Sequence, residues 1–311
     1  MHLYGMGCWQ IGGPLSINGK PDGWSLKTQS DIEFLLQSAY QSGIRFFDTS
    51  SSYGISGRSE NLLGEFLSQY ADVEVSTKFG NIHLTDSTIE KCFSRDCLMF
   101  SLEKSLQRLK RNNINTFLLH GFPPEGFISD ELLITFEDLK NSNVIQHWGV
   151  SPSTFEQVKT CIENRYGDTL EWVYHILDRR VEALFEVMQR SETRLIARSP
   201  LASGLIPKSL VNKVEFYTDV DNEDYSSVIN RDFKNWVFET LYPHRATLEM
   251  KASAREFALR FFLDKPVFKV IPGIRNVAHF SKLKNALRIG KLNVIEQACL
   301  KSLPISFPGY K

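Results

Sequence analysis

The chain has no excess of charge of either sign. Its 311 residues contain 36 lysines and arginines against 36 aspartates and glutamates, so the formal net charge is zero with histidine neutral. A protein of this kind has no overall field that would hold nucleic acid or an anionic membrane surface. We therefore expect neither as a partner, and we expect any anionic ligand to bind at a local site.

Cysteine is scarce and shows no paired spacing. The number of cysteines is odd and no C-x-x-C pair occurs among them: Cys8, Cys92, Cys97, Cys161 and Cys299. This usage speaks against a disulfide framework and a structural zinc site, and it favours a reducing cytoplasm. The seven histidines form no H-E-x-x-H motif, so we expect no metal.

Long apolar runs are also missing. No run of 18 apolar residues occurs, and no basic segment followed by an apolar one stands at the N-terminus. We expect a cytoplasmic protein that is neither exported nor inserted in a membrane. A G-x-S-x-G motif is absent as well, which leaves nucleophilic hydrolysis without support.

Apolar residues are plentiful and regularly placed. They make up 42% of the chain, with 22 phenylalanines, which suffices for a large core. Short β-rich runs alternate with longer amphipathic segments from end to end, a pattern typical of a parallel sheet. Eight strands are expected at Leu3–Cys8, Ile44–Phe47, Val73–Thr77, Thr116–Leu119, His147–Val150, Leu170–Val173, Arg194–Ala197 and Phe268–Ile271. Eight helices are expected at Asp31–Gln41, Glu60–Ser68, Cys97–Leu109, Asp130–Asn141, Phe155–Glu163, Val181–Arg190, Leu248–Leu263 and Val277–Leu287.

Eight strand-then-helix units predict one α/β domain over residues 1–311, folded as a (β/α)8 TIM barrel. An open doubly wound sheet fits less well, since no G-x-G-x-x-G follows the first strand. Ser30 is expected to start the first helix, and Ser153 or Thr154 the fifth.

The stretch after the seventh strand, about residues 199–245, is too long for an ordinary loop. Its centre, Asp219–Asp224, is acidic and polar. We expect either a flap over the functional site or a surface excursion with its own short helix.

Ionisable residues end three successive predicted strands, at Asp48, Lys78 and His120. In a barrel such ends meet at the C-terminal face. A buried Lys78 beside Asp48 would place positive charge near the Tyr53 phenol and lower its pKa, so that Tyr53 could exchange a proton with a substrate oxygen. His120 could hydrogen-bond the same oxygen. Each residue also has a structural alternative, as a cap, a core histidine or a lysine reaching water.

The sequence resembles the aldo-keto reductases around these residues, in Phe47–Gly54 and Ser59–Gly64. Further matches follow in family order at Ser76–Gly80, Ser101–Leu102, Ser105–Leu109, Leu118–His120, Gly149–Ser151, Leu177–Arg180, Ser199–Gly204 and Ile271–Gly273.

The resemblance implies a barrel oxidoreductase that transfers a hydride between NADP(H) or NAD(H) and a small aldehyde, ketone or sugar-like alcohol. It implies that Tyr53 is the general acid or base, that Lys78 and Asp48 tune it, and that His120 orients the carbonyl.

Two positions that contact the nicotinamide amide in the family are altered here. Pro152 stands where asparagine is usual and Glu171 where glutamine is usual, while Ser151 keeps the expected chemistry. A carboxylate accepts a hydrogen bond from the amide nitrogen but cannot donate one to its oxygen. Arg198 stands where relatives often have an aromatic ring, and either stacks on the nicotinamide or forms a surface ion pair.

The adenosine end also departs from the family, with Lys282-Leu283 where Glu-Asn is common. Gly273 and Arg275 are expected to hold a phosphate, and Lys282 to add a charge, which favours NADP(H) over NAD(H). Three further residues match cofactor-binding positions: Ser199, Leu201 and Gly204. Trp9 and Phe79 are expected to wall an apolar substrate pocket, with core packing as the alternative.

Two other functions remain open. The altered residues Pro152, Glu171 and Leu283 would suit a cofactor-sensing or partner-binding barrel with little turnover. A barrel epimerase or lyase could instead use Tyr53 and Lys78 for proton transfer without net redox chemistry.

Overall fold

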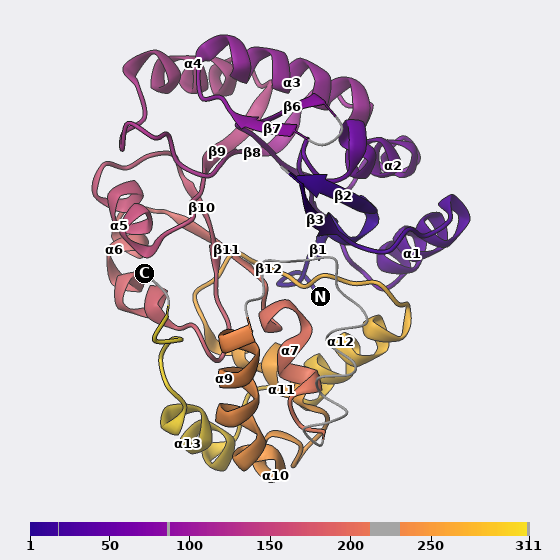
Figure 1. The fold of residues 1–311 in the computed structure, drawn as a ribbon, viewed down its shortest axis with the longest axis vertical. Coiled ribbons are helices and arrows are strands. Elements are labelled where there is room, and N and C mark those ends of the chain that lie inside the picture. The colour runs from indigo at the N-terminus through magenta and orange to yellow at the C-terminus, as the bar shows by residue number, and fades with distance from the viewer. Residues whose placement is uncertain (18, 86–87, 212–230, 310–311) are drawn as a thin grey trace.

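A computed structural model of the protein describes residues 1–17, 19–85, 88–211 and 231–309. Its centre is a nearly closed barrel of eight parallel strands with helices around it (Figure 1). In spatial order, the barrel strands are β1 (Met6–Gly7), β4 (Phe46–Asp48), β5 (Glu74–Phe79), β8 (Ile114–His120), β9 (Ile145–Ser151), β10 (Thr169–Val173), β11 (Arg194–Arg198) and β12 (Lys269–Ile271). The predicted (β/α)8 fold and all eight predicted strands are thus confirmed.

The first and last strands complete the ring. The Gly5 amide donates to the Val270 carbonyl at 2.8 Å, and the Gly7 amide donates to the Pro272 carbonyl at 3.1 Å. Because Phe46 and Ile271 pack against Gly5, a Cβ atom there would lie 2.7 Å from the Phe46 ring. Glycine at this position therefore lets the short strand β1 approach its neighbours.

The helices of the structure are α1 (Gln29–Gln41), α2 (Arg58–Leu67), α3 (Arg95–Leu109), α4 (Asp130–Asn141), α5 (Phe155–Glu163), α6 (Phe185–Arg190), α7 (Leu205–Lys208), α9 (Arg231–Leu241), α10 (Arg245–Leu248), α11 (Ala254–Arg260), α12 (Ala278–Ile289) and α13 (Val294–Ser302). Of these, α1 to α5 and α12 begin and end close to the predicted bounds, whereas α7, α9 and α13 were not predicted. The predicted helix Val181–Arg190 is α-helical only from Phe185, because a 3-10 helix covers Arg180–Leu184. Thr154 caps α5 with a capping box, as predicted. The prediction that Ser30 starts the first helix was wrong, because Thr28 accepts the hydrogen bond from the Asp31 amide.

One predicted helix is in fact two. The segment Leu248–Leu263 divides between α10, which ends at Leu248, and α11, which begins at Ala254 after Ser253. Ser253 and Glu256 form a capping box, which starts a new helix in place of continuing the old one.

The region after β11 contains helical segments, including α7 and α9. The predicted acidic centre, Asp219–Asp224, lies outside the described residues. Residues 199–204 line the cavity discussed below, while α9 packs its buried Phe233 and Val237 into the core. The described part of this region therefore contributes both to the site and to the surface layer.

Two β-hairpins were not predicted. The first pairs β2 (Pro14–Ile17) with β3 (Lys20–Gly23), and the second pairs β6 (Asn81–Thr85) with β7 (Thr88–Lys91). The two hairpins contact each other through β2 and β7, outside the eight-stranded barrel (Figure 1).

Cys92 and Cys97 form a disulfide, contrary to the expectation from cysteine spacing. Cys92 follows β7, and Cys97 lies in the first turn of α3, where its amide donates to the Ser94 side chain at 3.2 Å. The turn that caps the helix brings the two thiols together, which a spacing rule cannot foresee. The disulfide ties the second hairpin to α3.

Replacing both Cys92 and Cys97 with serine should lower the free energy of unfolding by about 2 kcal/mol, since the bridge closes only a short loop. Urea denaturation measures this change. Wild-type protein in a reducing buffer should match the double variant. Equal stability of oxidised and reduced wild-type protein would contradict the prediction.

In the part of the chain that the structure describes, no helix has the length and hydrophobicity needed to cross a membrane.

Candidate active site

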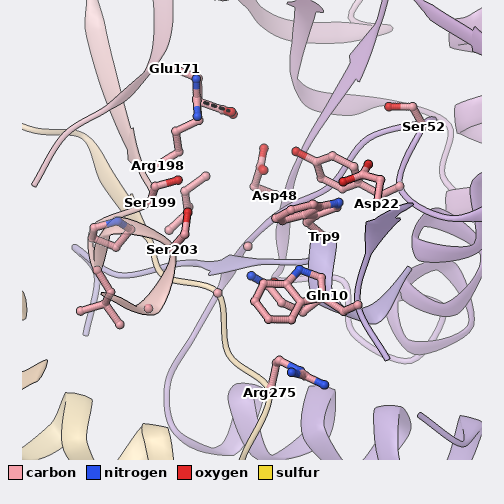
Figure 2. A pocket seen from close by; sticks show the side chains of 18 of the residues that line it. Trp9, Gln10, Asp22, Asp48, Ser52, Glu171, Arg198, Ser199, Ser203 and Arg275 are labelled. Carbon is pink, nitrogen blue, oxygen red and sulfur yellow. Dashed lines mark ion pairs between the residues drawn. The ribbon is translucent and has the colours of Figure 1, made fainter. Parts of the chain in front are cut away.

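A cavity of about 710 Å³ opens at the ends of the barrel strands. Its wall includes His120 at the end of β8. It also includes Asp48 at the end of β4, Glu171 from β10 and Arg198 at the end of β11 (Figure 2). The four elements meet here because parallel strands of a barrel end on one face.

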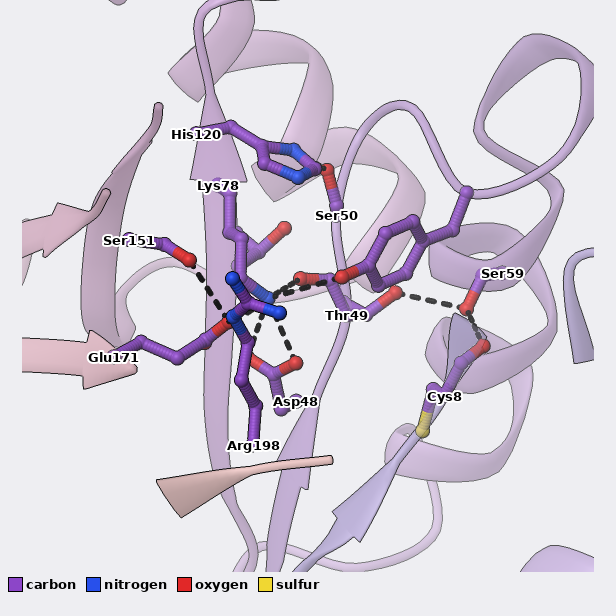
Figure 3. A network of polar contacts seen from close by, with 12 residues as sticks. Cys8, Asp48, Thr49, Ser50, Ser59, Lys78, His120, Ser151, Glu171 and Arg198 are labelled. Atoms are coloured by element: carbon purple, nitrogen blue, oxygen red, sulfur yellow. Dashed lines mark hydrogen bonds and ion pairs between the residues drawn. The ribbon is translucent and has the colours of Figure 1, made fainter. Parts of the chain in front are cut away.

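The three ionisable residues predicted from strand ends lie together with Tyr53. Lys78 Nζ donates to both carboxylate oxygens of Asp48 at 2.7 Å and to the Thr49 carbonyl at 3.0 Å (Figure 3). The same Nζ lies 3.4 Å from Tyr53 Oη. His120 contacts Tyr53 edge to face, with ring centroids 5.8 Å apart. The four side chains therefore form one cluster.

The loop after β4 holds Tyr53 at the cavity wall. Ser59 on α2 donates to the Cys8 carbonyl and shares a hydrogen bond with Thr49, both at 2.8 Å. Gly54 has φ of +84°, and its backbone lies against the Gly12 carbonyl, where a Cβ atom would overlap that oxygen. Only glycine fits this turn without strain. The segments 47–54 and 59–64 noted in the sequence thus fix the phenol in place.

His120 is held as a neutral imidazole. Its Nδ1 lies 3.0 Å from Ser50 Oγ and 3.4 Å from Ser52 Oγ. Burial, followed by the positive charges of Lys78, Lys91 and Arg198, holds the pKa of His120 well below its usual value. The ring can hydrogen-bond a ligand without carrying a charge.

The expected lowering of the Tyr53 pKa is wrong. Burial raises the pKa of Tyr53, and the Lys78 ammonium lowers it without overcoming burial. Burial also acts to lower the pKa of Lys78, but the Asp48 and Glu171 carboxylates outweigh it, so the net pKa is raised. Tyr53 therefore keeps its proton and Lys78 its charge at neutral pH.

Glu171 and Ser151 contact each other within the cluster. Ser151 Oγ donates to Glu171 Oε1 at 3.0 Å, and Lys78 Nζ lies 3.2 Å from Glu171 Oε2. Arg198 Nε is 4.0 Å from Glu171 Oε1, so Arg198 pairs loosely with a buried carboxylate.

A sequence profile of the aldo/keto reductase family matches residues 5–303. The chain belongs to the aldo/keto reductase family. Its members are NAD(P)H-dependent oxidoreductases that act on small carbonyl substrates. This chain is accordingly an oxidoreductase of that kind, and the barrel described above matches the family fold.

Relatives of this aldo/keto reductase include an uncharacterized oxidoreductase, YqkF, of Bacillus subtilis, which is 26% identical over 86% of each chain. A putative aryl-alcohol dehydrogenase of Schizosaccharomyces pombe, C977.14c, is 25% identical over 60% of this chain and 61% of its own. Among solved structures, aldo-keto reductase AKR11C1 of Bacillus halodurans, in its holo form, superposes with a TM-score of 0.78 at 22% identity, covering 99% of this chain and 94% of its own. The glycerol dehydrogenase AKR11B4 of Gluconobacter oxydans gives 0.76 at 21% identity, covering 96% and 90%. The two structures share the fold.

The residues present fit the dinucleotide that aldo/keto reductases use. Arg255 and Arg275 line the end of the cavity that contains Gly273, and Arg275 Nε has no hydrogen-bond partner among the described residues. The guanidinium of Arg275 lies over the Trp24 ring, 4.8 Å from its centroid. Gly204, with φ of +88°, leaves open space beside the cavity. Cations and exposed backbone suit phosphate groups.

Most residues predicted to bind the cofactor line this cavity: Glu171, Arg198, Ser199, Leu201, Gly204, Gly273 and Arg275. Ser151 does not line the cavity; it is buried and donates to Glu171. Lys282 does not line the cavity, because its half-exposed side chain points to Glu256, at 3.8 Å. Leu283 is buried in the core, so its apolar side chain serves packing.

Of the two residues predicted to wall the substrate pocket, one lines the cavity and the other does not. Trp9 lines the cavity and packs edge to face on Trp24, with centroids 5.6 Å apart. The prediction for Phe79 was wrong: its ring is fully buried and stacks on Phe117 at 5.3 Å. Successive residues of a strand point to opposite faces, so when Lys78 points into the barrel, Phe79 points toward the helices.

Several residues of this cavity were missed in the sequence. They come from the first loop, from the two hairpins and from α11: Gln10, Asp22, Trp24, Asn81, Lys91 and Arg255. A signal for the first hairpin was present, because Asn18-Gly19 separates Leu15 and Ile17 from Lys20. An Asn-Gly pair beside alternating apolar residues is a strong indicator of a two-residue hairpin turn.

Proposed function

We propose that the protein reduces the carbonyl group of a small aldehyde, ketone or sugar-like substrate, with Tyr53 as the proton donor. One observation carries this assignment: Lys78 Nζ lies 3.4 Å from Tyr53 Oη while it holds both oxygens of Asp48 at 2.7 Å. When bound, the reduced nicotinamide cofactor supplies the hydride that the substrate carbon receives.

The residues of the chain supply the proton, stabilise the resulting phenolate and orient the substrate. Tyr53 gives its proton to the carbonyl oxygen as negative charge develops there. Lys78 stabilises the phenolate that results, and Asp48 keeps the Lys78 ammonium in place. His120, neutral and anchored through Nδ1 by Ser50, orients the carbonyl. Because burial raises the pKa of Tyr53, the phenol carries its proton at neutral pH, as reduction requires.

The experiment is to mix purified protein with NADPH or NADH and a panel of aldehydes, ketones and aldoses. Loss of the reduced-nicotinamide absorbance, together with identification of the alcohol product, measures reduction. Each consumed cofactor should match one molecule of alcohol. Conversion of any substrate without a nicotinamide cofactor would contradict the proposal and favour the non-redox alternative.

The second candidate function is a cofactor-sensing or partner-binding barrel with little turnover. The contacts of Glu171 favour it, because Ser151 and Lys78 both engage the carboxylate that replaces the usual carboxamide. Tight NADPH binding with no turnover on any carbonyl, and a stable partner in pull-down experiments, would support this second function over the first.

We also propose that NADP(H) is preferred to NAD(H), because two arginines, Arg255 and Arg275, line the cavity. Arg275→Leu should weaken NADPH binding by roughly 10- to 100-fold, the usual effect of losing a charge-assisted hydrogen bond. NADH binding should change little. Quenching of Trp9 and Trp24 fluorescence provides the measurement.

Arg288→Leu is the matched control, since Arg288 lies on the exposed face of α12, does not line the cavity and donates to Asn285. That variant should bind both cofactors as the wild type does. If Arg275→Leu weakens the two cofactors equally, Arg275 does not contact a phosphate specific to NADP(H).

A further inference from the structure

Lys78 lies between two buried carboxylates. Its Nζ is 2.7 Å from Asp48 Oδ2 and 3.2 Å from Glu171 Oε2, and none of the three side chains is more than 3% exposed. Glu171 Oε1 accepts a further hydrogen bond from Ser151. One ammonium group cannot neutralise two carboxylates, so full ionisation would leave an excess negative charge in a buried site.

We propose that Glu171 is a positioning residue for Lys78, and that Glu171 and Asp48 share one proton around its ammonium group at neutral pH. This inference deepens the proposed function, because Lys78 is the ammonium next to Tyr53. Glu171 contacts Nζ beside Asp48 and helps to keep Lys78 charged.

The physical reason is the mutual repulsion of two close carboxylates. When two carboxyl groups lie close together in a buried site, the ionisation of one disfavours the ionisation of the other, so the pair releases its protons in two separate steps. Burial, followed by the Glu171 carboxylate, raises the pKa of Asp48 to about 8, against the lowering effect of Lys78. This pKa belongs to the pair.

The other groups around the pair leave the excess charge in place. His120 is neutral, and Tyr53 keeps its proton. Burial also raises the pKa of Cys8, which faces Asp48, so the thiol adds no charge. Arg198 on β11 offsets part of the negative charge, but its side chain is 33% exposed and its Nε is 4.0 Å from Glu171. Solvent screens a contact of this kind.

The test uses cofactor-free protein, so it does not depend on turnover. A carboxyl group whose pKa is higher in the folded state binds more protons there than in the unfolded state, between the two pKa values. Stability should therefore fall as pH rises from about 4 to about 8. Infrared spectroscopy at pH about 7 should also show a protonated carboxyl band, which should vanish above the pKa of the pair.

Three variants separate the contributions. Glu171→Gln leaves Asp48 alone with Lys78, so it should remove the infrared band and flatten the fall in unfolding temperature with pH. Arg198→Met removes the offsetting cation, so the band should persist to higher pH. Glu296→Gln is the matched control, because it removes a different buried carboxylate, one paired with Arg260.

The control should lower the unfolding temperature at every pH without changing its slope near neutral pH, because the pKa of Glu296 is lowered and the group stays ionised there. A wild-type protein without the band, or with the same slope as Glu171→Gln, would overturn the inference. If Glu171→Gln does not fold, Arg198→Met provides the test. The inference is supported if the protonated-carboxyl band disappears at a higher pH than in the wild type, and overturned if it disappears at the same pH. Absence of turnover on every carbonyl, with the band present, would instead reject only the proposed function.

Discussion

Tyr53→Phe should lower kcat for carbonyl reduction by roughly 100- to 10,000-fold, the usual contribution of a positioned proton donor. The variant removes one oxygen and keeps the ring that packs on His120. Since the lost hydroxyl contacts Lys78 only at 3.4 Å, folding and cofactor binding should change little. Steady-state kinetics with NADPH and the best substrate of the panel measure the effect.

Tyr40→Phe is the control for this substitution. Its hydroxyl donates to Asp72 at the surface, and Tyr40 does not line the cavity. We expect its kcat to equal that of the wild type. Turnover of Tyr53→Phe within a few fold of wild type would remove the assigned mechanism, even if the protein is a reductase.

Lys78→Met should lower the free energy of unfolding by about 3 to 5 kcal/mol near neutral pH, because it leaves buried carboxylate charge without its cation. Asp48 loses the partner of both its oxygens, and Glu171 loses its contact with the ammonium. Urea denaturation measures the loss. The penalty should shrink in acid, where the carboxyl groups are protonated and need no cation.

Lys159→Met is the matched control for loss of a lysine charge. Lys159 pairs with Glu156 on the exposed face of α5, and such surface pairs contribute about 0 to 1 kcal/mol. If Lys78→Met is as stable as this control at neutral pH, the carboxylates of the cluster do not depend on Lys78 for their burial. The assigned electrostatics of the site would then be wrong.

The local sequence pattern predicted much of the fold, because each strand-helix unit of the barrel can be recognised from its own residues. A short apolar run gives the strand, a helical period gives the covering helix, and an ionisable residue marks the strand end. Asp48, Lys78 and His120 follow this rule and lie together. The second hairpin, which pairs β6 with β7, and the break between α10 and α11 have no clear local apolar period and were missed, whereas the first hairpin was missed although its Asn-Gly turn signal was present.

Among the predicted site residues, the errors concern side chains that point away from the cavity. Phe79 is next to Lys78 in sequence but faces the helices, because side chains alternate along a strand. Lys282 lies on α12 and points to Glu256 rather than into the cavity. The lowered pKa expected for Tyr53 failed because burial, which depends on all surrounding elements, exceeds the effect of one neighbouring charge.

The sequence by itself determined the barrel, the order of its strands and the three residues, Asp48, Lys78 and His120, that gather around Tyr53, because strand periodicity and strand ends are local properties. Only the tertiary structure decided that Glu171 gives Lys78 a second carboxylate, that Cys92 and Cys97 are bridged, and that two hairpins complete the cavity. These features depend on distances between residues far apart in the chain or on the path of a turn, and a hydrophobic pattern does not encode them.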